Sequence, residues 1–172
     1  MKDRELWKEI YTKYAKRMLV VCMRYSRGRE EAEDRMHDGF MQVFRSLDKF
    51  TDRGEGSLRA WMERIMINTC LQHIRKKDLL RDSRPVEKIP EPAGDPFLEV
   101  ATERIPSQVL HRLIQELPPG YRTVFNLYVF EGMSHKEIAE QLGIMEKTSS
   151  SQFYRAKSLL ARQIKEYEDK QR

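Results

Sequence analysis

The chain has 172 residues, of which 34% are charged and 40% are hydrophobic, and it carries a net charge of +5. No apolar run approaches the roughly 20 residues that a membrane-spanning helix needs, and the charged N-terminus lacks a signal-peptide core, so we expect a soluble cytoplasmic protein with no membrane insertion. Residues 1–80 hold 18 basic and 13 acidic side chains, residues 81–106 hold 4 and 6, and residues 107–172 hold 10 and 8. Two basic blocks that flank an acidic connector weakly favour a polyanionic partner.

The first block predicts three or four helices that form a bundle. Apolar residues recur at three- and four-residue steps between Trp7 and Tyr25, which predicts one helix with a single apolar stripe. A second amphipathic helix is expected from about residue 30 to residue 47. A glycine-containing loop then leads to a third helix from about residue 58 to residue 78, which Ser57 could cap.

The third helix of this block combines an apolar face with a polar stripe that spans roughly a quarter turn. Cations can follow the backbone of an unpaired strand while an aromatic ring stacks on its bases, so the stripe and the basic residues after it are a candidate single-strand site. Its residues are Trp61, Arg64, Asn68, Gln72, Arg75, Lys76 and Lys77. In the alternative, Trp61 lies in the core and the stripe merely faces water.

The periodicity disappears between residues 80 and 106, where five prolines interrupt the chain. A stretch of this composition cannot bury enough apolar surface to fold alone, so we expect a flexible linker. Fully extended, its roughly 27 residues would reach about 90 Å. The predicted organisation is a domain over residues 1–79, a linker over 80–106 and a domain over 107–172, and a long surface loop within one domain is the alternative.

The second block begins with an apolar-striped helix that a Pro-Pro pair stops, followed by a helix from about residue 121 to residue 131. Ser134 and Glu137 have capping-box spacing at the start of a short helix that stops at Gly143. A longer helix is expected from about residue 146 to the C-terminus. Because strand-like alternation is missing, the sequence predicts an all-α fold of two small helical domains, the second with four helices.

Residues 134–155 fit a helix-turn-helix. Ala139 is the small residue needed where the two helices cross, and Gly143 tolerates the positive φ of the turn. The last helix carries no acid between residues 147 and 165, and we expect its first turns to expose short polar groups to base edges and phosphates. The candidate duplex-binding residues are Ser134, His135, Lys136, Lys147, Thr148, Ser149, Ser150, Gln152, Arg155 and Lys157. A solvated helix face on an unrelated bundle is the alternative.

A carboxylate–histidine cluster is present, but it lacks the partners that a metal site needs. The cluster comprises Glu30, Glu31, Glu33, Asp34, His37 and Asp38. A di-iron bundle needs a matching carboxylate-x-x-His motif on another helix, so a solvated or partner-binding face is favoured. Phosphate loops, HExxH and GxSxG motifs and Cys–His pairs are absent from the sequence, so we expect no enzyme activity, no metal and no cofactor. Cys22 and Cys70 lie in apolar patterns and are expected to be buried free thiols.

Two sets of motifs, in order along the chain, resemble a known family. The first block is similar to region 2 of the extracytoplasmic-function (ECF) class of bacterial sigma factors in Glu31-Ala-Glu-Asp34, Asp38-Gly-Phe40, Trp61-Met-x-x-Ile65 and Asn68 through Ile74-Arg75. The second block is similar to region 4 of that class in Leu117-Pro-x-x-Tyr121-Arg-x-Val-Phe125, Glu131-Gly-Met-Ser134, Glu137-Ile-Ala-Glu-x-Leu-Gly-Ile144 and Tyr154-Arg-Ala156. The resemblance covers most of the chain.

This resemblance implies a non-catalytic subunit that recruits core RNA polymerase to promoters and is a monomer when free. Its partners would be core RNA polymerase, promoter DNA and an anti-sigma factor. The third helix would open and read the −10 element, the helix-turn-helix would read the −35 element, and the linker would set the reach between them. The implied core-binding residues are Asp34, His37, Asp38, Phe40, Met41 and Phe44.

The sequence departs from the family pattern at positions that bear on promoter choice. Gln72 stands where the family usually has Asp, His73 replaces a common Tyr or aliphatic residue, and Met145 stands where Ser or Pro often begins the recognition helix. Lys147 and Ser150 replace a frequent Gly and a frequent basic residue. The alternative function is a one-component helix-turn-helix regulator that acts without core polymerase. An adaptor or anti-sigma role is disfavoured because both candidate DNA-facing helices keep their cations.

Overall fold

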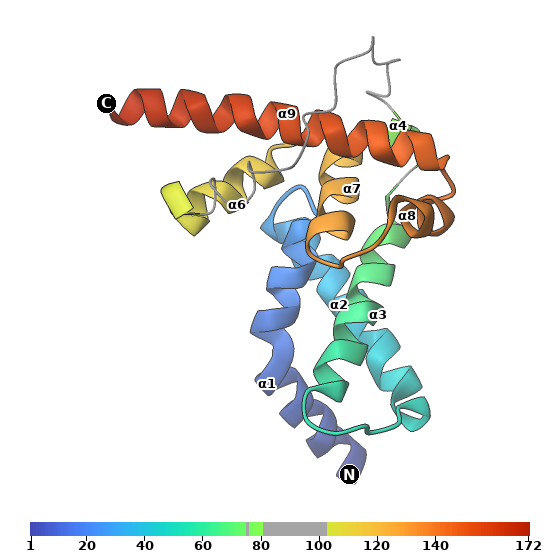
Figure 1. The fold of residues 1–172 in the computed structure, drawn as a ribbon. Helices are drawn as coiled ribbons and strands as arrows, with labels where there is room; N and C mark the ends of the chain where they lie inside the picture. The colour runs from blue at the N-terminus through green and yellow to red at the C-terminus, as the bar shows by residue number, and fades with distance from the viewer. Residues whose placement is uncertain (75, 81–102) are drawn as a thin grey trace. The chain divides into compact units, whose positions relative to one another are not determined.

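The computed structural model describes residues 1–74, 76–80 and 103–172. These residues form helices and no strand, in two compact units, Met1–Ile74 and Arg75–Arg172 (Figure 1). The prediction of an all-α fold with two helical domains is confirmed. None of the helices in these ranges is long and apolar enough to cross a membrane. The elements in chain order are α1 (Lys2–Arg24), α2 (Arg29–Ser46), the 3-10 turn η1 (Leu47–Lys49), α3 (Ser57–Gln72), α4 (Lys76–Leu80), α6 (Ser107–Gln115), α7 (Pro119–Val129), α8 (His135–Leu142) and α9 (Glu146–Gln171).

The first unit is a bundle in which α1, α2 and α3 each pack on the other two (Figure 1). Its apolar stripes meet in a core that excludes nearly all water, as their sequence spacing predicts. The fully or almost fully buried side chains are Met18, Val21, Cys22, Ala32, Met36, Phe40, Val43, Met62, Met66 and Cys70. At Gly39 the α2 backbone approaches α3 so closely that an added Cβ would collide with the Met66 sulfur.

The second unit is organised around α9, on which α6, α7 and α8 all pack (Figure 1). Its core contains Leu113, Ile114, Leu117, Val124, Phe125, Leu127, Ile138, Phe153, Ala156, Leu160 and Ile164. The four expected helices are present. α4 joins them as a further element, because it packs on α7 and its Leu79 is buried.

The predicted third helix, residues 58–78, is wrong in its length. α3 ends at Gln72, where the N–H groups of His73 and Ile74 donate over 3.2 Å to the oxygens three residues earlier, the tighter pattern with which helices often end. α4 is a separate helix, because burial of Leu79 in the second unit overrides the helical periodicity of the sequence. The division between the units therefore falls after Ile74, and the predicted linker residues 81–102 lie outside the described residues.

The loop before α3 uses Ser57 differently from the prediction. Gly56, at a φ of 81°, is the residue that precedes the helix, and no side chain caps it. The Ser57 hydroxyl instead donates to Asp52 Oδ1 over 3.0 Å and accepts from the Arg53 N–H. Asp52 also accepts from the Gly54 N–H, and this bond, followed by the bond from Ser57, lowers the pKa of the Asp52 carboxyl. The capping role predicted for Ser57 is wrong.

Candidate nucleic-acid interface

The start of α8 and the turn after it have the geometry of a helix-turn-helix. The Ser134 hydroxyl accepts from the Glu137 N–H over 3.1 Å, and the Ser134 N–H donates to Glu137 Oε2 over 2.7 Å. Gly143 ends α8 at a φ of 66°, and the N–H of Ile144 returns to the Ala139 oxygen over 3.1 Å. The predicted capping box and left-handed turn are both confirmed. These two features fix where α9 leaves the turn.

His135 ties the start of α8 to the recognition helix α9. Its Nδ1 lies 2.9 Å from the Ser149 hydroxyl, and its ring stacks on Tyr128 with centroids 4.7 Å apart. Burial lowers the pKa of His135, while Glu146 raises it and Lys157 lowers it. His135 is therefore partly exposed, and these contacts restrain it between α7 and α9.

Two of the side chains expected to face DNA are buried, so that part of the prediction is wrong. Ser149 is 0% exposed and Gln152 is 2% exposed. Gln152 Nε2 donates over 2.9 Å to the Leu79 carbonyl of α4. The sequence contained the signal, because Ser149 and Gln152 each lie four residues before a core position of α9, Phe153 and Ala156 respectively, and so share its buried face.

The remaining residues of the predicted duplex-binding set lie at or near the surface of the second unit. Ser134, Lys136, Lys147 and Ser150 are exposed, and Thr148, Arg155 and Lys157 are partly exposed. The Lys157 ammonium lies 4.8 Å from the centre of the Phe153 ring, a cation–π contact that restrains it. Sequence reasoning missed Ser151 and Tyr154, which are partly exposed and lie four and seven residues after Lys147, on the same side of α9.

The α3 stripe is only partly assembled. Arg64, Asn68 and Gln72 are exposed along one side of the helix. Trp61 is neither buried nor free, because its ring packs on Phe50 with centroids 5.2 Å apart. The other predicted members do not continue this helix. Arg75 and the Lys76 side chain lie outside the described residues, and Lys77 is exposed on α4 in the second unit.

An aromatic ladder joins α1 to the predicted polymerase-binding side of α2. Trp7 stacks on Phe44 with centroids 4.9 Å apart, and Tyr11 packs on Phe40 at 4.8 Å. Phe44 is partly exposed, but Phe40 is only 2% exposed, so Phe40 supports this side of the helix from within and does not present its ring to a partner. The exposed predicted residues are Asp34, His37, Asp38 and Met41.

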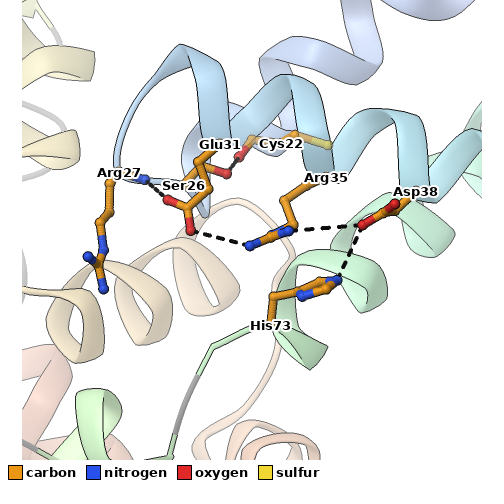
Figure 2. A network of polar contacts seen from close by, with 7 residues as sticks. All are labelled: Cys22, Ser26, Arg27, Glu31, Arg35, Asp38 and His73. Carbon is orange, nitrogen blue, oxygen red and sulfur yellow. Dashed lines mark hydrogen bonds and ion pairs between the residues drawn. The ribbon is translucent and has the colours of Figure 1, made fainter.

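A chain of polar contacts connects α2 with the end of α3 (Figure 2). The Arg27 N–H donates to Glu31 over 2.7 Å, and the other Glu31 oxygen lies 3.7 Å from the Arg35 guanidinium. Arg35 lies 3.9 Å from Asp38, whose Oδ2 lies 3.5 Å from His73 Nε2. Asp38 is therefore held between two basic groups within the unit (Figure 2).

Cys22 and Cys70 are buried and form no disulfide, as predicted. A hydrogen-bond contact with Cys22, followed by burial, raises the pKa of the Cys70 thiol, so it stays protonated. Within the described ranges no group of three or more His, Cys, Asp or Glu side chains is arranged to hold a metal ion.

Comparison with known proteins gives matches to both halves of the chain. Residues 10–79 match the model of Sigma-70 region 2, and residues 107–160 match that of Sigma-70 region 4. The ECF RNA polymerase sigma factor SigE of Mycolicibacterium smegmatis is 29% identical over 90% of this chain, which spans 60% of that relative's length. The RNA polymerase sigma-H factor of Pseudomonas aeruginosa is 27% identical over 92% of this chain and 86% of the relative's length. The ECF RNA polymerase sigma factor SigM of Mycobacterium tuberculosis is 26% identical over 93% of this chain and 78% of the relative's length. With both regions matched in order and relatives of this class aligned along nearly the whole chain, the protein belongs to the extracytoplasmic-function class of the sigma-70 family, whose members direct core RNA polymerase to promoters.

Proposed function

We propose that this sigma factor reads the −35 promoter element with the first turns of α9 and the −10 element with α3, and that α2 docks on core RNA polymerase. The observation that carries the proposal is the fixed helix-turn-helix, in which the capping box and Gly143 present a recognition helix whose residues 147 to 165 include no acid. A helix presented with its N-terminal end first fits the major groove of duplex DNA.

On the duplex, the exposed and buried residues of this unit have different tasks. Lys136, Lys147, Arg155 and Lys157 bind phosphates and set affinity, and the exposed Ser150 contacts base edges together with Thr148. His135 and the buried Ser149 fix the angle of α9 instead of touching DNA. We assign core binding and −10 reading to residues 1–79, −35 reading to residues 107–172 and the connecting role to residues 80–106; the compact units themselves divide after Ile74.

On the melted strand, the exposed Arg64, Asn68 and Gln72 of α3 contact the unpaired −10 strand, and Trp61 offers its ring for stacking. Stacking on an aromatic ring contributes about 1–3 kcal/mol per base, so a base stacked on Trp61 would offset part of the cost of unpairing the strand. Arg75, Lys76 and Lys77 add cations that follow the same backbone.

Core polymerase is bound through the acidic side of α2. Asp34, His37, Asp38 and Met41 provide the exposed contacts, and Phe44 extends them toward α1. The chain acts in the cytoplasm as a monomer when free, is held inactive by an anti-sigma factor, and performs no catalysis of its own.

Reconstituted transcription tests this function against a one-component regulator. The chain is mixed with core RNA polymerase and a genomic library of templates, and the transcripts are sequenced. A shared start-site pattern that appears only when both proteins are present is expected, together with weak duplex binding by the chain alone. Tight, specific duplex binding by the chain alone, with no transcripts from competent core enzyme, would refute the proposal.

A further inference from the structure

Met145 carries an exposed apolar side chain on a fixed backbone, directly before the recognition helix. Its side chain is 71% exposed, and among the large apolar side chains of the described residues only Met1 is more exposed. The Ile144 N–H donates to the Ala139 oxygen over 3.1 Å. The Met145 oxygen accepts the Ser149 N–H over the same distance. The side chain therefore leaves the protein from a fixed point at the start of α9.

A polar residue would stabilise the fold better at this position. Met145 has the extended backbone (φ −75°, ψ 149°) of a residue that precedes a helix, and no side chain caps α9. Ser, Thr, Asp or Asn there would accept a hydrogen bond from a free N–H of the first turn. A single exposed methionine is common on protein surfaces. One that takes the place of a stabilising cap, beside a proposed binding surface, indicates that the side chain serves that surface.

The surface around Met145 is the one that we propose holds duplex DNA. Lys147 is exposed, and Thr148, three residues after Met145 and on the same side of the helix, is partly exposed. Glu146 is the only acid between residues 144 and 165, and it lies near enough to His135 of α8 to raise the pKa of that ring. A helix that enters the major groove with its N-terminal end first brings the residues at its start to the base edges.

The chemistry of methionine limits what Met145 can bind in that groove. Its side chain has no hydrogen-bond donor and only a weak acceptor, so it can neither hold a phosphate nor pair with the polar edge of a base. The only apolar group that the base edges present in the major groove is the 5-methyl group of thymine. An unbranched, polarizable thioether adapts its shape to such a group. Apolar contact therefore favours thymine over the other bases at the position that faces Met145.

We propose that Met145 is a specificity-determining residue of the −35 reader and packs on the 5-methyl group of a thymine in the −35 element. The chain thus exchanges the stability of a helix cap for a preference among bases. This inference rests on the proposed function, because it requires α9 to lie in the major groove of the −35 duplex.

Removal of a single methyl group from the DNA tests this contact. Uracil lacks only the 5-methyl group of thymine, so each thymine of the −35 element is replaced in turn by uracil, on either strand. The promoter is one found by reconstituted transcription, and competition measures the affinity of the complete polymerase complex. Met145→Ala removes the side chain beyond Cβ, and Met145→Leu keeps an apolar side chain. Val20→Ala is the matched control, because Val20 is an apolar residue of α1 that is 50% exposed.

Uracil at one position should weaken binding by the wild type and by Val20→Ala about fourfold, the value expected for one buried methyl group. Met145→Ala should bind thymine and uracil at that position about equally, and Met145→Leu should keep most of the preference. A −35 element with no thymine whose methyl group affects wild-type binding would overturn the proposal. The same thymine preference in the wild type and Met145→Ala, or a loss in Met145→Leu as complete as in Met145→Ala, would also overturn it.

Transcription separates failure of this contact from failure of the proposed function. Far-ultraviolet circular dichroism checks that each variant retains its helices, which we expect because the Met145 side chain is exposed. A wild-type complex that transcribes and protects the −35 duplex, but shows no effect of any thymine methyl group, would refute the role of Met145 alone. Absence of promoter-dependent transcription with the wild type would refute the proposed function, and this inference with it.

Discussion

Replacement of His135 by Phe should destabilise the second unit while keeping its ring stack. Phe preserves the planar contact with Tyr128 but removes the nitrogen that lies 2.9 Å from the Ser149 hydroxyl. Ser149 is 0% exposed, so its hydroxyl would be left buried without this partner. An unsatisfied buried polar group costs about 1–3 kcal/mol, and we expect a loss of about 2 kcal/mol in the unfolding free energy of this unit. His135→Ala should cost about 1 kcal/mol more because it also removes the stack.

Urea unfolding followed by two probes measures this loss and contains its own control. Both tryptophans, Trp7 and Trp61, lie in the first unit, so tryptophan fluorescence reports that unit alone. Circular dichroism reports both units. The variant should shift only the circular dichroism transition, and His111→Ala, at an exposed position of α6, should shift neither. A His135→Phe midpoint equal to that of the wild type would refute the role of the Ser149 contact.

The same residue gives the second unit a pH dependence whose sign follows from its pKa. Burial lowers the pKa of His135 below the ordinary value of 6.5 in the folded protein. Between these two values the unfolded chain binds the proton and the folded chain does not, so stability is complete above about pH 6.5 and falls as the pH drops toward the folded pKa. Unfolding titrations of the wild type should show this fall, and His135→Phe should lack the component that His135 contributes. The same pH dependence in both proteins would contradict the assignment.

Three further predictions concern binding and helix stability. Arg155→Ala and Lys157→Ala should each reduce the magnitude of the slope of log binding constant against log salt concentration for −35 DNA by about 0.9, because one phosphate contact is lost. Lys170→Ala, at the exposed far end of α9, should leave this slope unchanged. Equal slopes in all three variants would count against the placement of DNA along α9. Met145→Ser should raise the unfolding free energy by about 1 kcal/mol, because a Ser hydroxyl at this position can cap α9. Met145 precedes the helix in an extended conformation and no side chain caps it. A lower unfolding midpoint in urea would show that Met145 makes a stabilising contact. Asp34→Lys should weaken binding to core polymerase at least tenfold, measured by competition, whereas Asp48→Lys, at an exposed position of η1, should not. A normal affinity for Asp34→Lys would remove Asp34 from the docking face.

The parts of the fold that depend on a few neighbouring residues were predictable from the sequence. Ser134 and Glu137 meet because capping-box spacing brings each side chain to the other's N–H, and Gly143 turns because it lacks a Cβ. The apolar stripes of α1 and α2 face the core for the same kind of local reason.

The residues that the sequence misplaced depend on contacts with distant parts of the chain. Ser149 and Gln152 are polar, so the sequence alone indicates surface residues. In the folded protein both are buried, Ser149 in contact with His135 and Gln152 hydrogen-bonded to the Leu79 carbonyl. Leu79 continues the periodicity of α3, but its burial site lies in the second unit. Phe40 belongs to a motif that the family uses for docking, yet Tyr11 of α1 covers its ring. In each case a tertiary partner, which local spacing does not encode, decides where the side chain lies.

Footprinting of the initiation complex on a transcribed promoter tests the central claim most directly. Hydroxyl-radical protection maps the duplex held by α9, and permanganate maps unpaired thymines near α3. With core polymerase present, we expect a protected duplex segment about two turns upstream of a permanganate-reactive segment, and Lys147→Ala should weaken only the upstream protection. Specific protection by the chain alone, or a transcribing complex with no protected upstream segment, would contradict the account.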